Sequence, residues 1–311
     1  MYLSKRKLAI LAIIVNTLIW SAAAPIFKWS LDATPPFTLA FLRFAIATLI
    51  MLPFVIHKLK IRPADFYKLF ILASIGITIH ISFYYLGLTL APSINVPIIT
   101  SMTPLFLIIA GVLFLHEKPK RKVLIGTFVS LIGVLIIVVR PNESTTAGSI
   151  LGNLYFVLAT LVFVWYTILL KQYKLQYSYS TIIFWIFFIG TIAMLPMFLL
   201  EAHTTNSLAT LNLKGSIGIM YGALFSSTFG YILYNYAAKY ISANEIGIFS
   251  YLEPIATALV AIPLLHEEIT FTYLLGGVVV FLGIFIAEAK LHYHPFHHLK
   301  RLNDPPLDSG P

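Results

Sequence analysis

The stretch LEPIATALVAIPLLHEE, residues 252–268, places an acidic residue and a proline inside a long apolar run. An earlier stretch, TPLFLIIAGVLFLHE at residues 103–117, repeats its main features. In both, a proline lies thirteen residues before the glutamate of a Leu-His-Glu triplet, and a glycine lies nine residues after that glutamate. Self-similarity at a fixed spacing, here 150 residues, indicates a duplicated structural unit.

The same spacing pairs further positions along the chain, so the similarity is not confined to one motif. The pairs are Tyr84 with Tyr234, Ile98 with Ile248, Leu124 with Leu274, Val129 with Val279 and Ile136 with Ile286. We therefore predict two homologous repeats, at residues 1–140 and 148–289. The polar, proline-containing residues 290–311 are expected to form a disordered cytoplasmic tail.

The composition places the chain in a membrane. Hydrophobic residues make up 59% and charged residues 11%, and the mean hydropathy is +0.89, whereas about a quarter of the residues of soluble domains are charged. Ten apolar runs are long enough to cross about 30 Å of hydrocarbon. We therefore expect an all-α membrane protein with ten transmembrane helices. The runs are 8–27, 37–56, 66–88, 94–115, 123–139, 151–170, 181–200, 215–236, 245–265 and 273–287.

The Lys and Arg residues near the ends of these runs indicate the orientation, because such residues stay on the cytoplasmic side. With the N-terminus inside, seventeen of them face the cytoplasm, and Lys28, Arg140 and Lys214 face outward. We expect both termini to be cytoplasmic. The net charge of +9 follows from this bias and requires no nucleic-acid partner.

Each repeat contains five segments, an odd number, so the second repeat must enter the membrane in the opposite orientation to the first. Two inverted five-helix repeats that enclose a site near the middle of the bilayer are a recurrent plan of secondary transporters. The organisation of the chain therefore predicts a transporter of a small-molecule substrate.

Several stretches also resemble a known family. TPLFLIIAGVLFLHE followed by GTFVSLIGVLII (126–137), and LEPIATALVAIPLLHEE followed by GGVVVFLGIFI (276–286), resemble the two halves of an EamA-type transporter of the drug/metabolite transporter (DMT) superfamily. IWSAAAPIFKWSL (19–31) and FLRF (41–44) are similar to that family's first two segments. The resemblance implies alternating access at a central cavity and favours export of amino acids or similar amphiphiles. A drug or nucleotide-sugar carrier of the same fold is the alternative.

Pro104 and Pro254 fall near the middle of the bilayer if a helix rises about 1.5 Å per residue. Proline removes a backbone hydrogen bond and crowds the carbonyl four residues earlier, so we predict a helix kink at each. Freed carbonyls at this depth must face protein or a water-filled cavity. Both a cavity lining and plain packing of kinked helices stay open here. The polar residues beside the kinks, candidates for substrate binding, are Thr100, Ser101, Ser250 and Tyr251.

Glu253 and Arg43 are charges predicted to lie within the membrane. Intramembrane charges mark pathways or proton relays, or pair with one another. One hypothesis is that Glu253 binds a substrate cation or exchanges a proton. The other is that it forms a fixed pair with Arg43, or caps polar groups at the kink.

Aromatic residues follow the two-fold plan. Trp20 and Trp165 are predicted to be too deep for an interfacial belt and are candidates to line a cavity and stack on substrate. Tyr84 and Tyr234 lie near segment ends, where a belt role competes with substrate contact. His80 is a further candidate, although a membrane histidine is more often hydrogen-bonded within the bundle.

Other function classes fit less well. The acid–base groups of a membrane enzyme must lie within hydrogen-bond reach, whereas His80, Glu253 and the pair His116–Glu117 fall at scattered depths. No Gly-rich, Lys-ending phosphate loop occurs. HYHPFHH at residues 292–298 has no acid or cysteine to complete a metal shell. We expect a carrier with no catalytic residue, cofactor or metal, in a prokaryotic cell membrane, with a channel as a third class.

Small residues predict close helix packing. Gly126 and Gly133 are seven residues apart and so share one helix face, as do Gly276 and Gly283. Such glycines let helices approach closely in a bilayer. The contact lies either within one chain or between the subunits of a homodimer.

Overall fold

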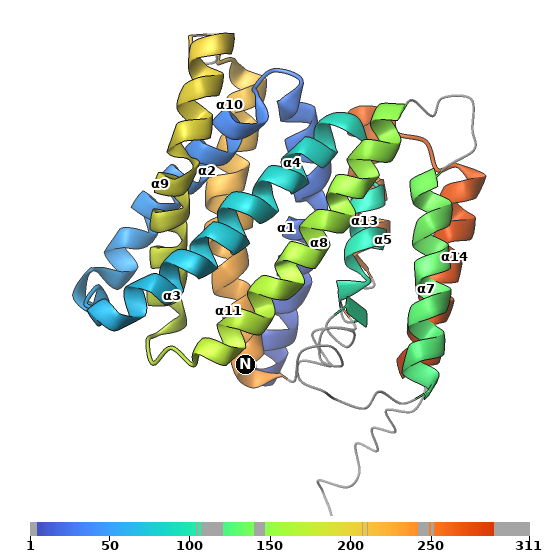
Figure 1. Ribbon diagram of the computed structural model, residues 1–311, viewed down its shortest axis with the longest axis horizontal. Coiled ribbons are helices and arrows are strands. Elements are labelled where there is room, and N and C mark those ends of the chain that lie inside the picture. Colours follow the sequence, from blue (N-terminus) through green and yellow to red (C-terminus); the bar gives the residue numbers. More distant parts are fainter. Residues whose placement is uncertain are drawn as a thin grey trace, which may run out of the picture.

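The computed structural model describes residues 5–103, 105–106, 121–139, 147–206, 208–209, 211–241, 249 and 252–288. All regular structure in these residues is helical (Figure 1). Among the short elements, η1 is a 3₁₀-helix, and η2 and η3 are π-helices. In chain order the elements are α1 (Lys5–Leu31), α2 (Pro36–Val55), η1 (Ile56–Lys58), α3 (Pro63–Ala73), η2 (Ser74–Ile79), α4 (His80–Leu90), α5 (Asn95–Thr100), α7 (Arg121–Val139), α8 (Ala147–Tyr173), α9 (Tyr179–Thr205), α10 (Leu213–Met220), η3 (Tyr221–Phe229), α11 (Gly230–Tyr240), α13 (Glu253–Leu265) and α14 (Phe271–Glu288).

Six helical segments are long and apolar enough to cross a membrane, and they confirm six of the ten predicted runs. They are Lys5–Leu31, Pro36–Lys58, Pro63–Leu90, Ser149–Leu170, Tyr179–Thr205 and Leu213–Ala237. Three shorter apolar helices, Leu124–Val138, Glu253–Leu265 and Phe271–Ile286, overlap the predicted fifth, ninth and tenth runs. Much of the predicted fourth run, and the predicted tail at residues 290–311, lie outside the described residues.

Local sequence explains where several helices begin. Pro36 and Pro63 lie in the first turns of α2 and α3, where a missing amide hydrogen costs nothing. The side-chain oxygens of Ser178 and Asn212 accept backbone hydrogen bonds in the first turns of α9 and α10. Long apolar stretches bounded by such residues form helices that bury their backbone polar groups internally, as a bilayer requires.

The helices pack in pairs drawn from distant parts of the sequence. The helix α2 packs against α9, α4 packs against α8, and α1 packs against both α11 and α13. The helices α7 and α14 form a separate pair at one side of the molecule (Figure 1). The largest fully buried side chains include Tyr85, Phe27, Phe44, Phe156 and Phe187. The core therefore lies where α1, α2, α4, α8 and α9 meet.

Two π-helices interrupt the long helical spans at corresponding places. The first, η2, joins α3 to α4 within Pro63–Leu90, and the second, η3, joins α10 to α11 within residues 213–240. The first residues of the two composite helices, Pro63 and Leu213, are 150 positions apart, and so are the last, Leu90 and Tyr240. The amides of Ala91 and Ile241, directly after them, each donate to the carbonyl four residues earlier, at 2.9 and 3.0 Å. Because π-helices are rare and concentrate at functional sites, the pair directs attention to the space that they face.

The pairing of α7 with α14 depends on glycine. A Cβ atom on Gly133 would lie 2.6 Å from the amide nitrogen of Val280, and one on Gly283 would lie 2.5 Å from the amide nitrogen of Ser130. Residues 133 and 283, and residues 130 and 280, are each 150 apart, so the two contacts are exchanged copies of one contact. The predicted glycine packing therefore occurs within one chain.

Candidate functional site

Arg43 is the buried cation at the centre of the helix bundle. It lies within α2, is 5% exposed, and all three of its guanidinium nitrogens donate hydrogen bonds. Nε donates to Ser227 Oγ at 3.0 Å, Nη1 to Tyr85 Oη at 3.0 Å, and Nη2 to Ser226 Oγ at 3.1 Å. Arg43 therefore ties α2 to α4 and to the π-helix η3.

Two aromatic rings pack on the Arg43 guanidinium. Its central carbon lies 4.7 Å from the ring centroids of both Phe27 and Phe44, a cation–π arrangement that stabilises a desolvated cation. Gly222 of η3 leaves room for the side chain, since a Cβ atom there would lie 2.7 Å from Arg43 Cδ. The site is thus built from both halves of the chain.

Arg43 has partners other than Glu253, the residue with which one of the two hypotheses paired it. The Arg43 guanidinium donates to hydroxyls, and none of the ion pairs between described residues includes Arg43. Glu253 is the first residue of α13, where the positive end of the helix dipole favours a carboxylate. Pro254 lies in the first turn of α13, where proline is well tolerated, and residues 250 and 251 before it lie outside the described residues.

A cavity of about 40 Å³ adjoins Arg43. Its polar lining consists of Arg43, His80, Tyr166 and Tyr231. The other lining residues are apolar: Phe44, Gly76, Ile77, Ile81, Phe163, Ile183, Ile186 and Phe187. These residues come from α2, η2, α4, α8, α9 and α11, so both halves of the chain enclose a space that has room for a few water molecules.

His80 begins α4, directly after the π-helix η2. Its Nδ1 lies 3.0 Å from the carbonyl oxygen of Ala159 on α8. A carbonyl only accepts, so Nδ1 carries the hydrogen, and Nε2 is an acceptor when the ring is neutral. The expected hydrogen bond of His80 within the bundle is confirmed, and the same side chain lines the cavity.

The predicted aromatic residues have different positions. Trp20 donates from Nε1 to the carbonyl of Ser226 at 3.1 Å and stacks on Tyr234, with ring centroids 5.5 Å apart. Tyr84 packs beside Tyr85, with ring centroids 5.6 Å apart. Trp165 is 38% exposed and is not among the residues that line this cavity. The next residue along α8, Tyr166, lines the cavity instead.

The remaining candidates do not line this cavity in the described structure. Thr100 and Ser101 each donate to a carbonyl three residues earlier in the chain, at 3.3 and 2.6 Å, and are absent from the described cavity wall. Pro104, Ser250 and Tyr251 lie outside the described residues. Among the described residues, no group of three His, Asp or Glu side chains could hold a metal ion.

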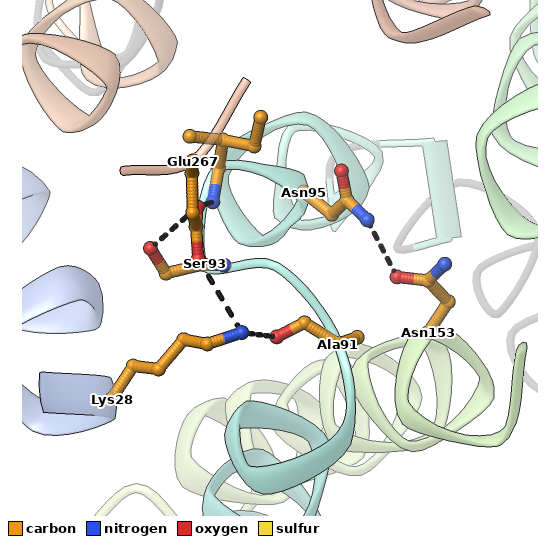
Figure 2. Close-up of polar contacts among 7 residues, drawn as sticks. Lys28, Ala91, Ser93, Asn95, Asn153 and Glu267 are labelled. Atoms are coloured by element: carbon orange, nitrogen blue, oxygen red, sulfur yellow. Dashed lines mark hydrogen bonds and ion pairs between the residues drawn. The ribbon is translucent and has the colours of Figure 1, made fainter. Parts of the chain in front are cut away.

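A second polar cluster joins three separate segments (Figure 2). Glu267, just after α13, accepts from the amide and hydroxyl of Ser93, at 2.7 and 3.0 Å, and from the amide of Ile94 at 3.0 Å. Lys28 of α1 forms an ion pair with the same carboxylate at 3.4 Å and donates to the carbonyl of Ala91. This cluster links α1, the α4–α5 connection and the end of α13.

Two amide side chains extend the connection to α8. Asn95 Nδ2 at the start of α5 donates to Asn153 Oδ1 at 2.8 Å, and both residues are buried (Figure 2). Figure 2 places this bond beside the Lys28–Glu267 cluster. The α4–α5 connection is thus held to helices from both halves of the chain.

Sequence reasoning missed several of these residues. It named Arg43 but not its acceptors, Ser226, Ser227 and Tyr85. One signal was present: SST at residues 226–228 interrupts an apolar segment, and a shift of 150 aligns Ser226 and Ser227 with the cavity residues Gly76 and Ile77. The interaction of Lys28 with Glu267 had no local signal, because 239 positions separate the two residues.

Known proteins are similar along most of this chain. An uncharacterized transporter of Archaeoglobus fulgidus is 27% identical over 286 residues, covering 91% of this chain and 98% of the relative. A second one from that organism is 28% identical over 285 residues, covering 92% and 99%. The uncharacterized transporter YetK of Bacillus subtilis is 26% identical over 269 residues, covering 85% and 81%.

Solved structures and a family profile extend the comparison. A crystal structure with 15% identity matches at a TM-score of 0.62, covering 96% of this chain and all of that chain, so the fold is shared. The profile of the EamA-like transporter family matches residues 7–139 and 150–288. These two matches cover most of the chain, and the protein therefore belongs to the EamA-like transporter family of the DMT superfamily, as a multi-pass membrane transporter and not an enzyme.

Proposed function

We propose that this protein is a secondary active transporter that exports small organic metabolites, amino acids or similar amphiphiles, by alternating access. Its two repeats, residues 1–140 and 148–289, are inverted relative to each other in a ten-helix arrangement, and both termini are cytoplasmic. The corresponding π-helices and the exchanged contacts of Gly133 and Gly283 support a two-fold relation between the repeats.

The observation that carries this proposal is the cavity between the two halves. It combines an apolar wall with a few convergent polar groups, Arg43, His80, Tyr166 and Tyr231, which is the usual make-up of a small-molecule site. Substrate sites of transporters with inverted repeats also lie at the repeat interface. At about 40 Å³ the cavity is smaller than a metabolite, so substrate entry requires the surrounding helices to separate.

The Lys28–Glu267 cluster supports a closed outer side of the cavity in this conformation. In the proposed orientation Lys28 lies at the outer end of α1, and its ion pair with Glu267 holds α1, the α4–α5 connection and α13 together. This cluster would close the outer side of the cavity. Opening to the outside then requires Lys28 and Glu267 to separate, which makes the cluster an outer gate.

Transport by purified protein in liposomes tests the proposal. Labelled pools of amino acids, sugars and nucleosides are offered with and without a pH gradient, beside protein-free liposomes and a Glu253→Gln variant. Saturable uptake of one pool is expected, with counterflow when the same solute is loaded inside. Absence of saturable flux for every pool would contradict a metabolite carrier, and ionic conductance without saturation would identify a channel. A pH response that Glu253→Gln leaves unchanged would exclude Glu253 from proton exchange.

A further inference from the structure

We infer that the substrate carries a carboxylate, and that Arg43, with His80 beside it, binds this group in the central cavity. This inference rests on the proposed function and narrows its substrate class to small organic carboxylates with an apolar body. It starts from an imbalance of charge in the described structure.

The groups that contact the Arg43 side chain among the described residues are neutral. Its acceptors are two serine hydroxyls and one tyrosine hydroxyl, and its faces contact two phenyl rings. The partly buried Lys28, by contrast, is paired with the carboxylate of Glu267. Burying an ion without a counter-ion is costly, so an anionic ligand would gain much of its binding energy by neutralising Arg43.

The guanidinium also retains donors for a ligand. It has five N–H hydrogens, and the three hydrogen bonds to Ser227, Tyr85 and Ser226 use one hydrogen on each nitrogen. One hydrogen therefore remains on each terminal nitrogen. A pair of terminal N–H groups on a planar guanidinium matches the two oxygens of a carboxylate.

Neighbouring groups hold Arg43 in place for this role. The hydrogen bonds that the guanidinium donates to α4 and η3, together with the flanking rings of Phe27 and Phe44, fix its plane. Pre-organisation of this kind lowers the entropic cost of binding a ligand. Whereas Arg43 offers donors, His80 offers a hydrogen-bond acceptor. Its Nδ1 bonds to the carbonyl of Ala159, so Nε2 of the neutral ring is left to accept. An amino or hydroxyl hydrogen of the substrate could donate to that atom.

The rest of the cavity wall selects the remainder of the substrate. Phe44, Phe163, Ile183 and Phe187 offer apolar contact, and no Asp or Glu belongs to the described lining. A cationic drug would meet the charge of Arg43 with no acid to offset it. The lining therefore favours an amphiphile with one carboxylate over a lipophilic cation.

The test compares carboxylic acids with their neutral or amidated analogues in proteoliposomes. Each amino acid that is transported is set against its amide and its methyl ester as competitors, and 4-methylpentanoate is set against 4-methylpentanamide. We expect each amide to compete about tenfold or more weakly than its acid, because hydrogen bonds to a charged group are lost. This series uses the unaltered protein and does not depend on any variant folding.

Three variants assign the discrimination to Arg43. In Arg43→Gln the preference for acid over amide should fall to near unity in whatever transport remains. In Arg43→Lys, which keeps the charge but loses the planar pair of donors, the preference should be intermediate. Lys214→Gln removes a half-buried cation that pairs with Asp32 outside the cavity lining and should leave the preference unchanged. The elution profile in detergent confirms that each variant is folded.

The outcomes separate this inference from the proposed function. Equal competition by acids and amides, or saturable transport of sugars or nucleosides that carboxylic acids do not inhibit, overturns the carboxylate site while the protein remains a carrier. A full preference for acids in folded Arg43→Gln overturns the role of Arg43. Absence of flux for every solute overturns the proposed function itself.

Discussion

The hydroxyl of Ser130 donates a hydrogen bond to the carbonyl oxygen of Val280 at 3.0 Å, and the two residues are 150 positions apart. They occupy equivalent places in the two repeats. A direct contact between equivalent residues is expected where a two-fold relation between the repeats passes through the interface. The helices α7 and α14 therefore pack against each other through equivalent positions of the two repeats.

Substitution at this interface should destabilise the protein. A side chain in Gly133→Val would meet the backbone nitrogen of Val280, which cannot move away as a flexible side chain would. Overpacking of this kind costs about 1–3 kcal/mol, so the unfolding temperature in detergent should fall clearly. Gly277→Ala is the matched control, because its Cβ would meet only the terminal Cδ1 atom of the Ile98 side chain, at 3.2 Å. Equal stability of the two variants would contradict the close contact.

Loss of one Arg43 acceptor should also lower stability. Tyr85→Phe removes a hydroxyl that receives a hydrogen bond from the buried guanidinium, and hydrogen bonds to charged groups are worth about 1.5–3 kcal/mol. Chemical or thermal unfolding in detergent measures the change. Tyr67→Phe alters a tyrosine that is 56% exposed and should have little effect. An unfolding temperature unchanged in Tyr85→Phe would show that water replaces the hydroxyl at no cost.

The Lys28–Glu267 cluster should respond to loss of its negative charge. Glu267→Gln removes the carboxylate that forms the ion pair with Lys28 and weakens the attachment of the α4–α5 connection. A cysteine in place of the half-buried Pro92 reports on opening, and the chain contains no other cysteine. We expect a membrane-impermeant maleimide to label Pro92→Cys several-fold faster in the Glu267→Gln background. Lys214→Gln, which breaks a pair with Asp32, should not change the labelling rate. A labelling rate that Glu267→Gln also leaves unchanged would exclude the gate.

The orientation of the repeats can be measured with single cysteines in intact cells. Asp32 lies between α1 and α2, and His57 lies in η1 at the opposite end of α2, and both are exposed. Asp32→Cys should react with an impermeant reagent from outside, whereas His57→Cys should react only after the cells are permeabilised. The reverse labelling pattern would overturn the cytoplasmic assignment of the N-terminus.

Much of the fold could be predicted from sequence because its signals are local. Six apolar runs correspond to helices long enough to span a membrane, since hydrophobic length alone selects a spanning helix. The spacing of 150 residues anticipated the packing of Gly133 and Gly283. The π-helices η2 and η3 had no such signal, because hydrophobicity along a helix changes little when one residue is inserted into a turn.

The residues of the candidate site could likewise be predicted only in part. Arg43 and His80 stood out as polar residues in apolar segments, and both line the cavity. Trp165 also stood out, yet it is 38% exposed while its neighbour Tyr166 faces the cavity. A single residue step turns a helix by about 100°, so a small error in the facing of α8 exchanges one residue for the next.

The sequence by itself determined the membrane-spanning character of the chain, its duplication and the presence of charges within apolar segments, because composition and spacing express these properties directly. Only the tertiary structure decided which groups contact those charged side chains. One of two hypotheses paired Arg43 with Glu253, whereas Arg43 donates to Ser226, Ser227 and Tyr85. Lys28 pairs with Glu267. The partner of a buried charge depends on which helices are neighbours and how each is rotated, and both follow from the packing of the whole bundle.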